Sequence, residues 1–239
     1  MQDEALRIED LHLTYRGLSG TAFSKPGAFG FFNTAKNDGD NELISGANLS
    51  LKRGETLCIG GPSGQGKSAL LRVIAGLARP SSGRVFYFGE YIPPERLTAL
   101  EVAKRQVGLV FQNGALISNL RVRDNIALPL RYHKKGTAAE IEEKINMAMD
   151  PMLLLMDEPT AGLDNYNRRN LLPLIDNMRT LFKTSIIIIT HDLMMAKELG
   201  CNLSFLYRKT LSEPHSFDYW LHANNDISKV LFRDLRTSG

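Results

Sequence analysis

Gly61-Pro62-Ser63-Gly64-Gln65-Gly66-Lys67-Ser68 is the stretch that decides the fold of this chain. It has the spacing G-x-x-x-x-G-K-[ST], and it lies between an apolar strand predicted over Thr56 to Gly60 and a helix whose apolar face runs from Leu70 to Leu77. Glycines in such a loop let main-chain N–H groups close around phosphate oxygens at a helix N-terminus, where the helix dipole favours negative charge. The pattern predicts a loop that binds nucleotide phosphates. A chance glycine-rich turn is the weaker alternative, because both flanking elements are present.

All eight residues of this loop are predicted to contact the nucleotide, two of them through side chains that carry chemistry. Lys67 is expected to reach the β- and γ-phosphates of ATP, and the Ser68 hydroxyl is expected to bind Mg²⁺. The other predicted nucleotide-binding residues are Gly61, Pro62, Ser63, Gly64, Gln65 and Gly66.

A second part of the site is predicted far downstream, where the apolar run Leu153 to Met156 ends in Asp157 and Glu158. A strand end places acids beside bound phosphates, so Asp157 is expected to hold Mg²⁺ through water and Glu158 to orient and polarise the attacking water. Paired acids after a strand usually just face solvent, but the phosphate loop makes the catalytic interpretation the stronger one. His191 follows a strand predicted over 186–190 and is expected to hydrogen-bond the γ-phosphate.

Composition describes an ordinary globular chain of 239 residues, with 43% apolar residues, 23% charged residues and a net charge of +3. Two cysteines, Cys58 and Cys201, are too few for a disulfide framework or a metal site, which favours a reducing compartment. No signal peptide or membrane-spanning run is visible, so we expect a cytosolic protein whose membrane partners, if any, are other subunits. Basic runs such as 131–135 are too short to indicate a nucleic-acid partner.

Strands and helices alternate along the chain, which predicts an α/β fold with a largely parallel sheet core, flanking helices and a ligand at the carboxyl ends of the strands. Two alternating apolar segments near the start, at Leu11 to Tyr15 and Ala47 to Leu51, predict N-terminal antiparallel strands. Between them, residues 16–42 form an irregular insertion rich in Gly, Ser, Asn and Asp. A further strand is predicted over Arg84 to Tyr91.

The second half of the chain contains two predicted helices and a shorter amphipathic segment. Thr137 to Glu140 has the pattern of a capping box and starts a helix that ends at Asp150-Pro151. Another helix is predicted over 168–182, and residues 227–235 have the spacing of a short amphipathic helix. Tyr219 and Trp220 precede that segment, and their sequence context fits either the core or an interface.

The order of these motifs resembles the nucleotide-binding subunit of an ATP-binding-cassette (ABC) protein, from about Leu6 to Leu206. The matching pieces are Tyr15 (the adenine-stacking aromatic), Gly61 to Ser68 (Walker A), Gln112 (the Q-loop), Leu153 to Glu158 (Walker B), Gly162-Leu163-Asp164 (the D-loop) and His191 (the switch histidine). The resemblance implies a P-loop NTPase of ABC type that forms one domain over residues 1–239. Gln112 would contact the metal and couple to a permease, and Asp164 would lie at a dimer contact.

Residues 111–116 and 125–130 resemble those of importer-type and lipid-transport (Mce/Mla-type) ATPases. The resemblance implies an ATP-binding subunit that uses ATP and Mg²⁺ and couples ATP hydrolysis to transport. Its partners would be membrane permease subunits, and it would be peripheral on the cytoplasmic face of the inner (plasma) membrane. It also implies a homodimer or a heterodimer with another ABC ATPase subunit. The alternatives are a nucleotide-binding regulatory or scaffold subunit with little turnover and a soluble ABC protein acting on DNA or ribosomes; no duplicated cassette or long heptad helix supports the latter.

One part of the family pattern is missing, because only 45 positions separate Gln112 from Asp157 and no Leu-Ser-Gly-Gly-type signature occurs between them. In the family, the signature of one subunit completes the ATP site of the other. Two helices of ordinary length and the signature turn would need roughly 30 more residues. The helical subdomain is therefore truncated to about 113–150, with an apparent excision near 147–150.

Three explanations of the missing segment compete. The natural chain has residues that this sequence omits, or the deletion is real and leaves a subunit that binds ATP but barely hydrolyses it, or a partner subunit supplies the one competent signature of a heterodimer. The first is favoured, because Glu158 and His191 are both retained.

Overall fold

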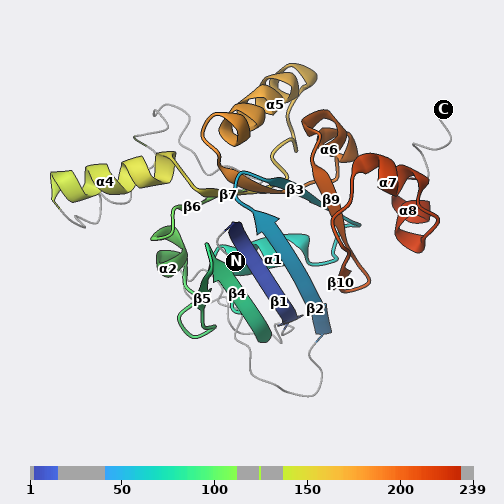
Figure 1. Cartoon of the computed structure of the whole chain (residues 1–239), viewed down its shortest axis with the longest axis horizontal. Helices are drawn as coiled ribbons and strands as arrows, with labels where there is room; N and C mark the ends of the chain where they lie inside the picture. The colour runs from blue at the N-terminus through green and yellow to red at the C-terminus, as the bar shows by residue number, and fades with distance from the viewer. Residues whose placement is uncertain (1–2, 16–40, 112–123, 125–136, 233–239) are drawn as a thin grey trace, which may run out of the picture.

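The computed structural model describes residues 3–15, 41–111, 124 and 137–232, and it forms an α/β fold built on two sheets (Figure 1). The strands are β1 (Glu4–Tyr15), β2 (Asn41–Lys52), β3 (Thr56–Gly60), β4 (Ser82–Tyr87), β5 (Glu90–Ile92), β6 (Val107–Val110), β7 (Leu153–Asp157), β8 (Ser185–Ile189), β9 (Asn202–Tyr207) and β10 (Thr210–Leu211). The helices are α1 (Lys67–Ile74), α2 (Ala99–Ala103), α4 (Ala138–Met149), α5 (Asn165–Thr180), α6 (Leu193–Leu199), α7 (Phe217–His222) and α8 (Asp226–Leu231). Within the described residues, no helix is both long and apolar enough to span a membrane.

The larger sheet has the strand order β10-β9-β3-β8-β7-β6, and its neighbours pair in parallel except for β10 with β9. All residues of β3, β7 and β8 are buried, as expected for parallel strands covered on both faces. The strand before the phosphate loop, β3, is separated by β8 from β7, the strand that ends in acids. The largely parallel core is thus confirmed, and the carboxyl ends of these three strands lie at one edge.

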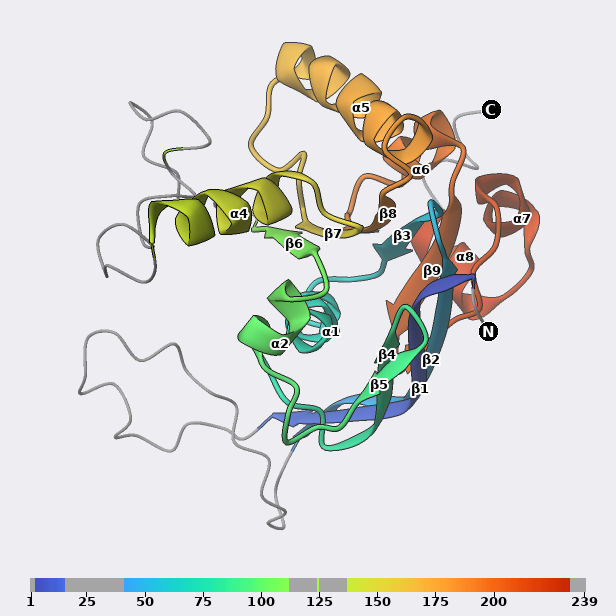
Figure 2. The same cartoon turned by 60° about the vertical axis from the view of Figure 1, so that its left-hand side comes forward.

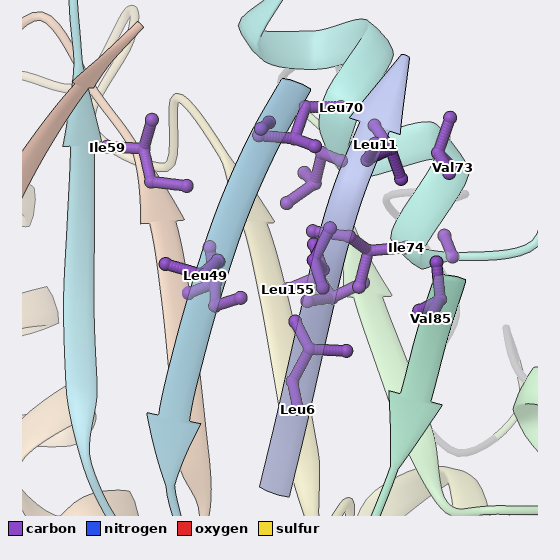
Figure 3. Close-up of a cluster of buried hydrophobic side chains, with 14 of the residues drawn as sticks. Leu6, Leu11, Leu49, Ile59, Leu70, Val73, Ile74, Val85 and Leu155 are labelled. Carbon is purple, nitrogen blue, oxygen red and sulfur yellow. The ribbon is translucent and has the colours of Figure 1, made fainter. Parts of the chain in front are cut away.

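One face of the parallel sheet packs into a core shared with α1 and with the second sheet, which has the order β2-β1-β4-β5 and is antiparallel throughout. Figure 3 shows part of this core, in which side chains of α1 and of both sheets meet; Leu6, Leu11, Leu49, Ile59, Leu70, Val73, Ile74, Val85 and Leu155 are labelled. These residues are almost completely buried. Because α1 carries Lys67 and Ser68 in its first turn, this core fixes the helix on which the phosphate loop depends.

The opposite face of the parallel sheet is covered by α5, α6, α7 and α8 (Figures 1 and 2). The period of two along each strand divides the side chains between the two cores: Leu155 and Ile187 join the first, whereas Met156 and Ile188 join the second. Trp220 is buried in the second core and donates from its ring N–H to the main-chain oxygen of Leu203 at 2.8 Å, whereas Tyr219 is exposed.

Several element boundaries differ from those predicted from the sequence, and turn geometry explains two of the differences. The strand expected over 84–91 is two strands, because Phe88 and Gly89 both adopt positive φ (53° and 87°) and form a two-residue hairpin turn. The helix α1 ends at Ile74 and not at Leu77, since Gly76 turns the chain at φ 69°. Strand β2 begins at Asn41, inside the segment expected to be irregular; the rest of that insertion lies outside the described residues.

The helix α4 begins as predicted, with a complete capping box between Thr137 and Glu140. It extends away from the parallel sheet in both views, and none of the other described elements packs closely against it (Figures 1 and 2). An open groove lies between α4 and Gln106, lined by Gln106, Ala139, Glu142, Glu143, Asn146 and Asp150. At its C-terminal end only three residues connect α4 to β7.

Candidate nucleotide-binding site

The phosphate loop connects β3 to α1 through glycines whose backbone geometry disfavours other residues. Gly61, Gly64 and Gly66 have φ of 136°, 78° and 96°, a region that L side chains rarely adopt. A Cβ on Gly61 would lie 2.3 Å from the main-chain oxygen of Leu206 in β9. The loop is also held from outside, because the Gln65 side chain accepts a hydrogen bond from the main-chain N–H of Arg208 at 3.0 Å.

Lys67 is buried in this loop and makes hydrogen bonds to it. Its Nζ donates to the main-chain oxygens of Gly61 at 2.8 Å and Pro62 at 2.9 Å, and lies 3.5 Å from Nε2 of His191. Burial lowers the pKa of Lys67, and the nearby carboxylates of Glu158 and Asp157 act in the opposite direction. The ammonium group is thus kept at the loop by carbonyls and two acids, where its charge can be offered to phosphate.

Ser68 and Asp157 come together from different elements. The Ser68 hydroxyl, in the first turn of α1, donates to Oδ1 of Asp157 at the end of β7, at 3.0 Å. Asp157 is almost fully buried. A hydroxyl and a carboxylate oxygen are the ligand types that Mg²⁺ prefers, and few protein ligands are expected where ATP and water supply the others. The pair therefore fits a magnesium ion bound together with ATP.

Glu158 and His191 face each other across the ends of β7 and β8. Oε2 of Glu158 accepts a hydrogen bond from the main-chain N–H of His191 at 3.2 Å, and its Oε1 lies 3.2 Å from Nε2 of the same histidine. Among the described residues, no donor makes a hydrogen bond to that buried Oε1. Glu158 also has φ 50°, a left-handed conformation that is uncommon for a non-glycine residue and is often found at functional sites.

Most of the residues predicted from the sequence meet at this edge of the sheet; of the other three, Asp164 has its described contacts elsewhere, and the side chain of Tyr15 and the whole of Gln112 lie outside the described part of the chain. Tyr15 is the last residue of β1 and pairs with Asn41 of β2. Asp164 caps the N-terminus of α5, where its Oδ1 accepts from the main-chain N–H of Asn167 at 2.7 Å. Gln112 lies outside the described residues, directly after Phe111.

One group of side chains beside the cluster was not predicted. Nε of Arg168, in α5, donates to Oδ2 of Asp192 at 2.8 Å, and the two terminal nitrogens of Arg168 lie 3.2 and 3.4 Å from the Glu198 carboxylate of α6. The hydrogen bonds that Arg168 donates to Asp192, and then to Glu198, raise the pKa of Arg168. Asp192 is recognisable in the sequence only as the residue after His191, and no local signal indicates that Arg168 reaches it.

The phosphate loop follows the buried parallel strand β3, and two acids end β7, with β8 lying between these two strands. This arrangement defines a P-loop nucleotide-binding protein. Comparison with known proteins identifies the family. Residues 44–151 match the model of a family described as "ABC transporter". A probable sulfate/thiosulfate import ATP-binding protein CysA of Chlorella vulgaris is 30% identical over an alignment that covers 73% of this chain and 85% of that protein. The chain belongs to the ABC transporter family, as one of its ATP-binding proteins.

Two further relatives have similar identity and are longer than this chain. The sulfate/thiosulfate import ATP-binding protein CysA of Mesostigma viride is 31% identical, with 70% of this chain and 56% of that protein covered. The methionine import ATP-binding protein MetN of Caulobacter vibrioides is 28% identical, with 82% and 69% covered. The chain therefore spans little more than half the length of the first of these and about two thirds of the second.

These alignments also contain a gap of consistent size. The one with the Chlorella vulgaris protein runs over 206 positions but covers 73% of the 239 residues here, about 174, so roughly 30 aligned positions have no counterpart in this chain. The Mesostigma viride alignment, with 200 positions and 70% coverage, leaves a gap of about the same size. The number of unmatched positions agrees with the length expected for the missing signature segment, and the match to the family model ends at Pro151, directly after α4.

Solved structures support the fold. The ATP-binding cassette MJ0796, in a structure described as a dimeric post-hydrolysis state bound to ADP and Pi, superposes with a TM-score of 0.64 at 20% identity, covering 88% of this chain and 98% of that one. A second dimeric structure of MJ0796, described as a bacterial ABC transporter cassette, gives a TM-score of 0.65. The fold that the family resemblance implies, a P-loop NTPase of ABC type, is confirmed.

Proposed function

We propose that this chain is the ATP-binding subunit of a transporter, and that it couples ATP binding and hydrolysis to movement of a small solute or lipid through a separate membrane permease. The observation that carries the proposal is the convergence of Lys67, Ser68, Asp157, Glu158 and His191 at the carboxyl ends of β3, β7 and β8. The family of the chain supports the same function, as do its relatives, which are named as import ATP-binding proteins.

In the proposed reaction, water attacks the γ-phosphate in line with the departing ADP. Main-chain N–H groups of residues 63–68 cradle the phosphates, and Lys67 exchanges its carbonyl partners for phosphate oxygens. Bound Mg²⁺, held by Ser68 and Asp157, would neutralise charge on the phosphate oxygens. The buried Oε1 of Glu158 has no described donor, so it is free to accept a hydrogen bond from the attacking water and orient it. His191 then donates to the γ-phosphate.

The remaining roles are proposals that rest on the family resemblance. Tyr15 stacks on the adenine, Gln112 contacts the metal and transmits closure to the permease, and Asp164 contacts the second subunit of a homodimer or heterodimer. The dimeric state named for MJ0796 supports a dimer here. The subunit would sit on the cytoplasmic face of the membrane that holds its permease.

A second candidate function is a nucleotide-binding regulatory or scaffold subunit that turns over little ATP. The observation in its favour is the direct connection of α4 to β7, together with roughly 30 unmatched positions in the alignments. Loss of one preorganised donor to a developing oxyanion typically costs about 3–4 kcal/mol of barrier, and a signature supplies more than one contact. ATP binding depends on the loop and is expected to survive this loss.

Measuring ATP affinity and turnover separately tests both candidates. The purified chain is titrated with ATP and Mg²⁺ by calorimetry, and phosphate release is followed with the chain alone and with its co-purified membrane partner. Tight binding with turnover in the complex supports the transport subunit. Tight binding without turnover, even in the complex, would leave the regulatory role, and the absence of any ATP binding contradicts both.

A further inference from the structure

The turn that carries His191 is held at fixed points on both sides of the histidine. Thr190 precedes it at the end of β8 and is completely buried. Asp192 follows it, donates from its main-chain N–H to the Thr190 hydroxyl at 2.9 Å, and caps α6 through Oδ1, which accepts from the main-chain N–H of Met195 at 3.3 Å. The position of the histidine main chain is therefore set by its two neighbours.

The His191 side chain itself has little packing to hold it, because 51% of it is exposed. Its geometry toward Lys67 (3.5 Å) and Glu158 (3.2 Å) must come from the main chain beneath it. The same main chain holds Glu158, since the His191 N–H donates to Oε2 of that glutamate. A displacement of the 190–192 turn would move two of the predicted catalytic groups together.

Arg168 fixes this turn from α5. The turn uses Oδ1 of Asp192 for the cap, so the other carboxylate oxygen, Oδ2, is available to accept the 2.8 Å hydrogen bond from Arg168 Nε. The far side of the guanidinium contacts Glu198 in α6, and the main-chain N–H of Arg168 bonds to the Asp164 oxygen at 2.9 Å. A planar, five-donor group can bridge two carboxylates in this way, whereas a lysine ammonium is a single point of charge on a flexible stem.

We propose that Arg168 is a positioning residue for the γ-phosphate side of the site: through Asp192 it fixes the main chain of His191 and with it the Glu158 carboxylate. This inference rests on the proposed function, because it assumes that His191 meets the γ-phosphate. Arg168 and Asp192 thus join the first turn of α5, which Asp164 caps, to the strand end that carries His191.

The variant Arg168→Gln removes the guanidinium and keeps a helix-forming residue of similar length. Arg169→Gln is the matched control, because Arg169 is the next residue of α5, is exposed, and loses the same charge. Arg168→Lys keeps the charge without the fork, and Asp192→Asn keeps an α6 cap but places an amide opposite Arg168. All four variants are made in the full chain, and their melting temperatures establish that they fold.

The first readout is the ratio of the dissociation constants for ATP and ADP, each with Mg²⁺. Arg168→Gln is expected to lower the preference for ATP by about five- to tenfold with little change in ADP affinity, because residues in one hydrogen-bond network are energetically coupled. Arg168→Lys recovers part of the preference, and Arg169→Gln retains it. The double variant with Asp192→Asn loses less than the sum of the two single effects.

The second readout needs no nucleotide and keeps the inference testable if the wild-type chain fails to bind ATP, the result that would contradict the proposed function. The NMR resonance of the His191 ring Cε1–H is expected to shift in Arg168→Gln and Asp192→Asn but not in Arg169→Gln. If Arg168→Gln matches Arg169→Gln in the ring resonance, the inference is wrong. It is also wrong if the effects of Arg168→Gln and Asp192→Asn on the ATP:ADP ratio simply add. Should Arg168→Gln not fold, Arg168→Lys and Asp192→Asn decide in its place.

Discussion

The nucleotide face of the parallel sheet and the α4 region belong to the same chain and differ sharply in how they are held. Lys67, Ser68, Asp157 and Glu158 each take part in at least one hydrogen bond within the site, and the strands beneath them are fully buried. The helix α4 has good local signals, including a complete capping box, yet it projects from the sheet without a close partner among the described elements (Figure 2).

This difference separates what local sequence can specify from what packing must supply. A cap satisfies the first N–H groups of a helix and is typically worth about 1 kcal/mol, whereas most helix stability in proteins comes from burying one face. The phosphate loop has both kinds of support, whereas the described side chains of α4 show the cap and the burial of a single apolar residue, Ile145. The strand ends that carry the proposed nucleotide site are therefore held by more contacts than the described part of α4.

The largest effect is expected from restoring the missing segment. Inserting the roughly 30-residue counterpart from the Chlorella vulgaris relative between Met149 and Asp150 is expected to raise ATP turnover by at least about a hundredfold, since each recovered oxyanion donor is worth about 3–4 kcal/mol. The control is a Gly/Ser insertion of equal length at the same place. ATP affinity, measured in parallel, is expected to change little.

Equal turnover in the two insertion variants would show that the α4 region does not limit hydrolysis.

The mass of the protein isolated from its natural source tests directly the favoured explanation of the missing segment. A chain heavier than 26.6 kDa would support residues that this sequence omits, and a mass of 26.6 kDa would leave the deletion or the heterodimer.

The next largest effect tests how rigidly the nucleotide face is built. Gly61→Ala is expected to lower the free energy of unfolding by about 3 kcal/mol or more, because its Cβ would lie 2.3 Å from a main-chain oxygen of β9 and its φ is 136°. Gly64→Ala is the matched control: it has nothing within 4 Å of its Cβ, so only the positive φ penalises it, by about 1 kcal/mol. Urea unfolding without nucleotide measures both, and similar losses would show that the loop is not held by β9.

A smaller effect, on binding, is expected from Lys67. Lys67→Ala removes charge-assisted hydrogen bonds to phosphate that are worth about 1.5–3 kcal/mol, so ATP affinity is expected to fall by roughly 10- to 100-fold. Arg72→Ala, an exposed position in the last turn of α1, removes a charge from the same helix and serves as the control. Calorimetric titration with ATP distinguishes them, and a loss shared by both variants would mean that the effect is only long-range charge.

The nucleotide face was readable from the sequence because its parts are local and ordered. The glycine spacing of residues 61–68 and the apolar run before Asp157 each predict an element with its functional end, and parallel strands bring those ends to one edge. Arg168 and Asp192 were not readable as a pair, because 24 positions separate them and only the packing of α5 beside α6 joins them. The hairpin at Phe88 was missed because a phenylalanine gives no turn signal, although Gly89 does.

The smallest effect is expected at the exposed surface of the antiparallel sheet, where His12 lies between two carboxylates. Its Nδ1 is 3.0 Å from Glu42 and its Nε2 is 3.2 Å from Asp10, and the hydrogen bond with Glu42 is the main cause that raises the pKa of His12. A raised pKa in the folded state contributes stability that is fully present below the unfolded value of 6.5 and is lost as the pH rises through the folded value. Reciprocally, His12 lowers the pKa of Glu42, and that contribution is lost in acid below the ordinary value of 4.5.

The unfolding free energy is therefore expected to decline by a few tenths to about 1 kcal/mol as the pH rises from about 6 to about 8.5, a range set by exposed pairs of this kind. Urea unfolding of His12→Gln is expected to lack this decline, and His222→Gln, whose ring contacts a main-chain oxygen instead of a carboxylate, is expected to retain it. A larger decline that survives in His12→Gln would point to another titrating group. Water screens exposed ion pairs such as those of His12, whereas the Ser68–Asp157 contact is mostly buried. We therefore expect a small effect on stability at His12 and large effects at the phosphate loop.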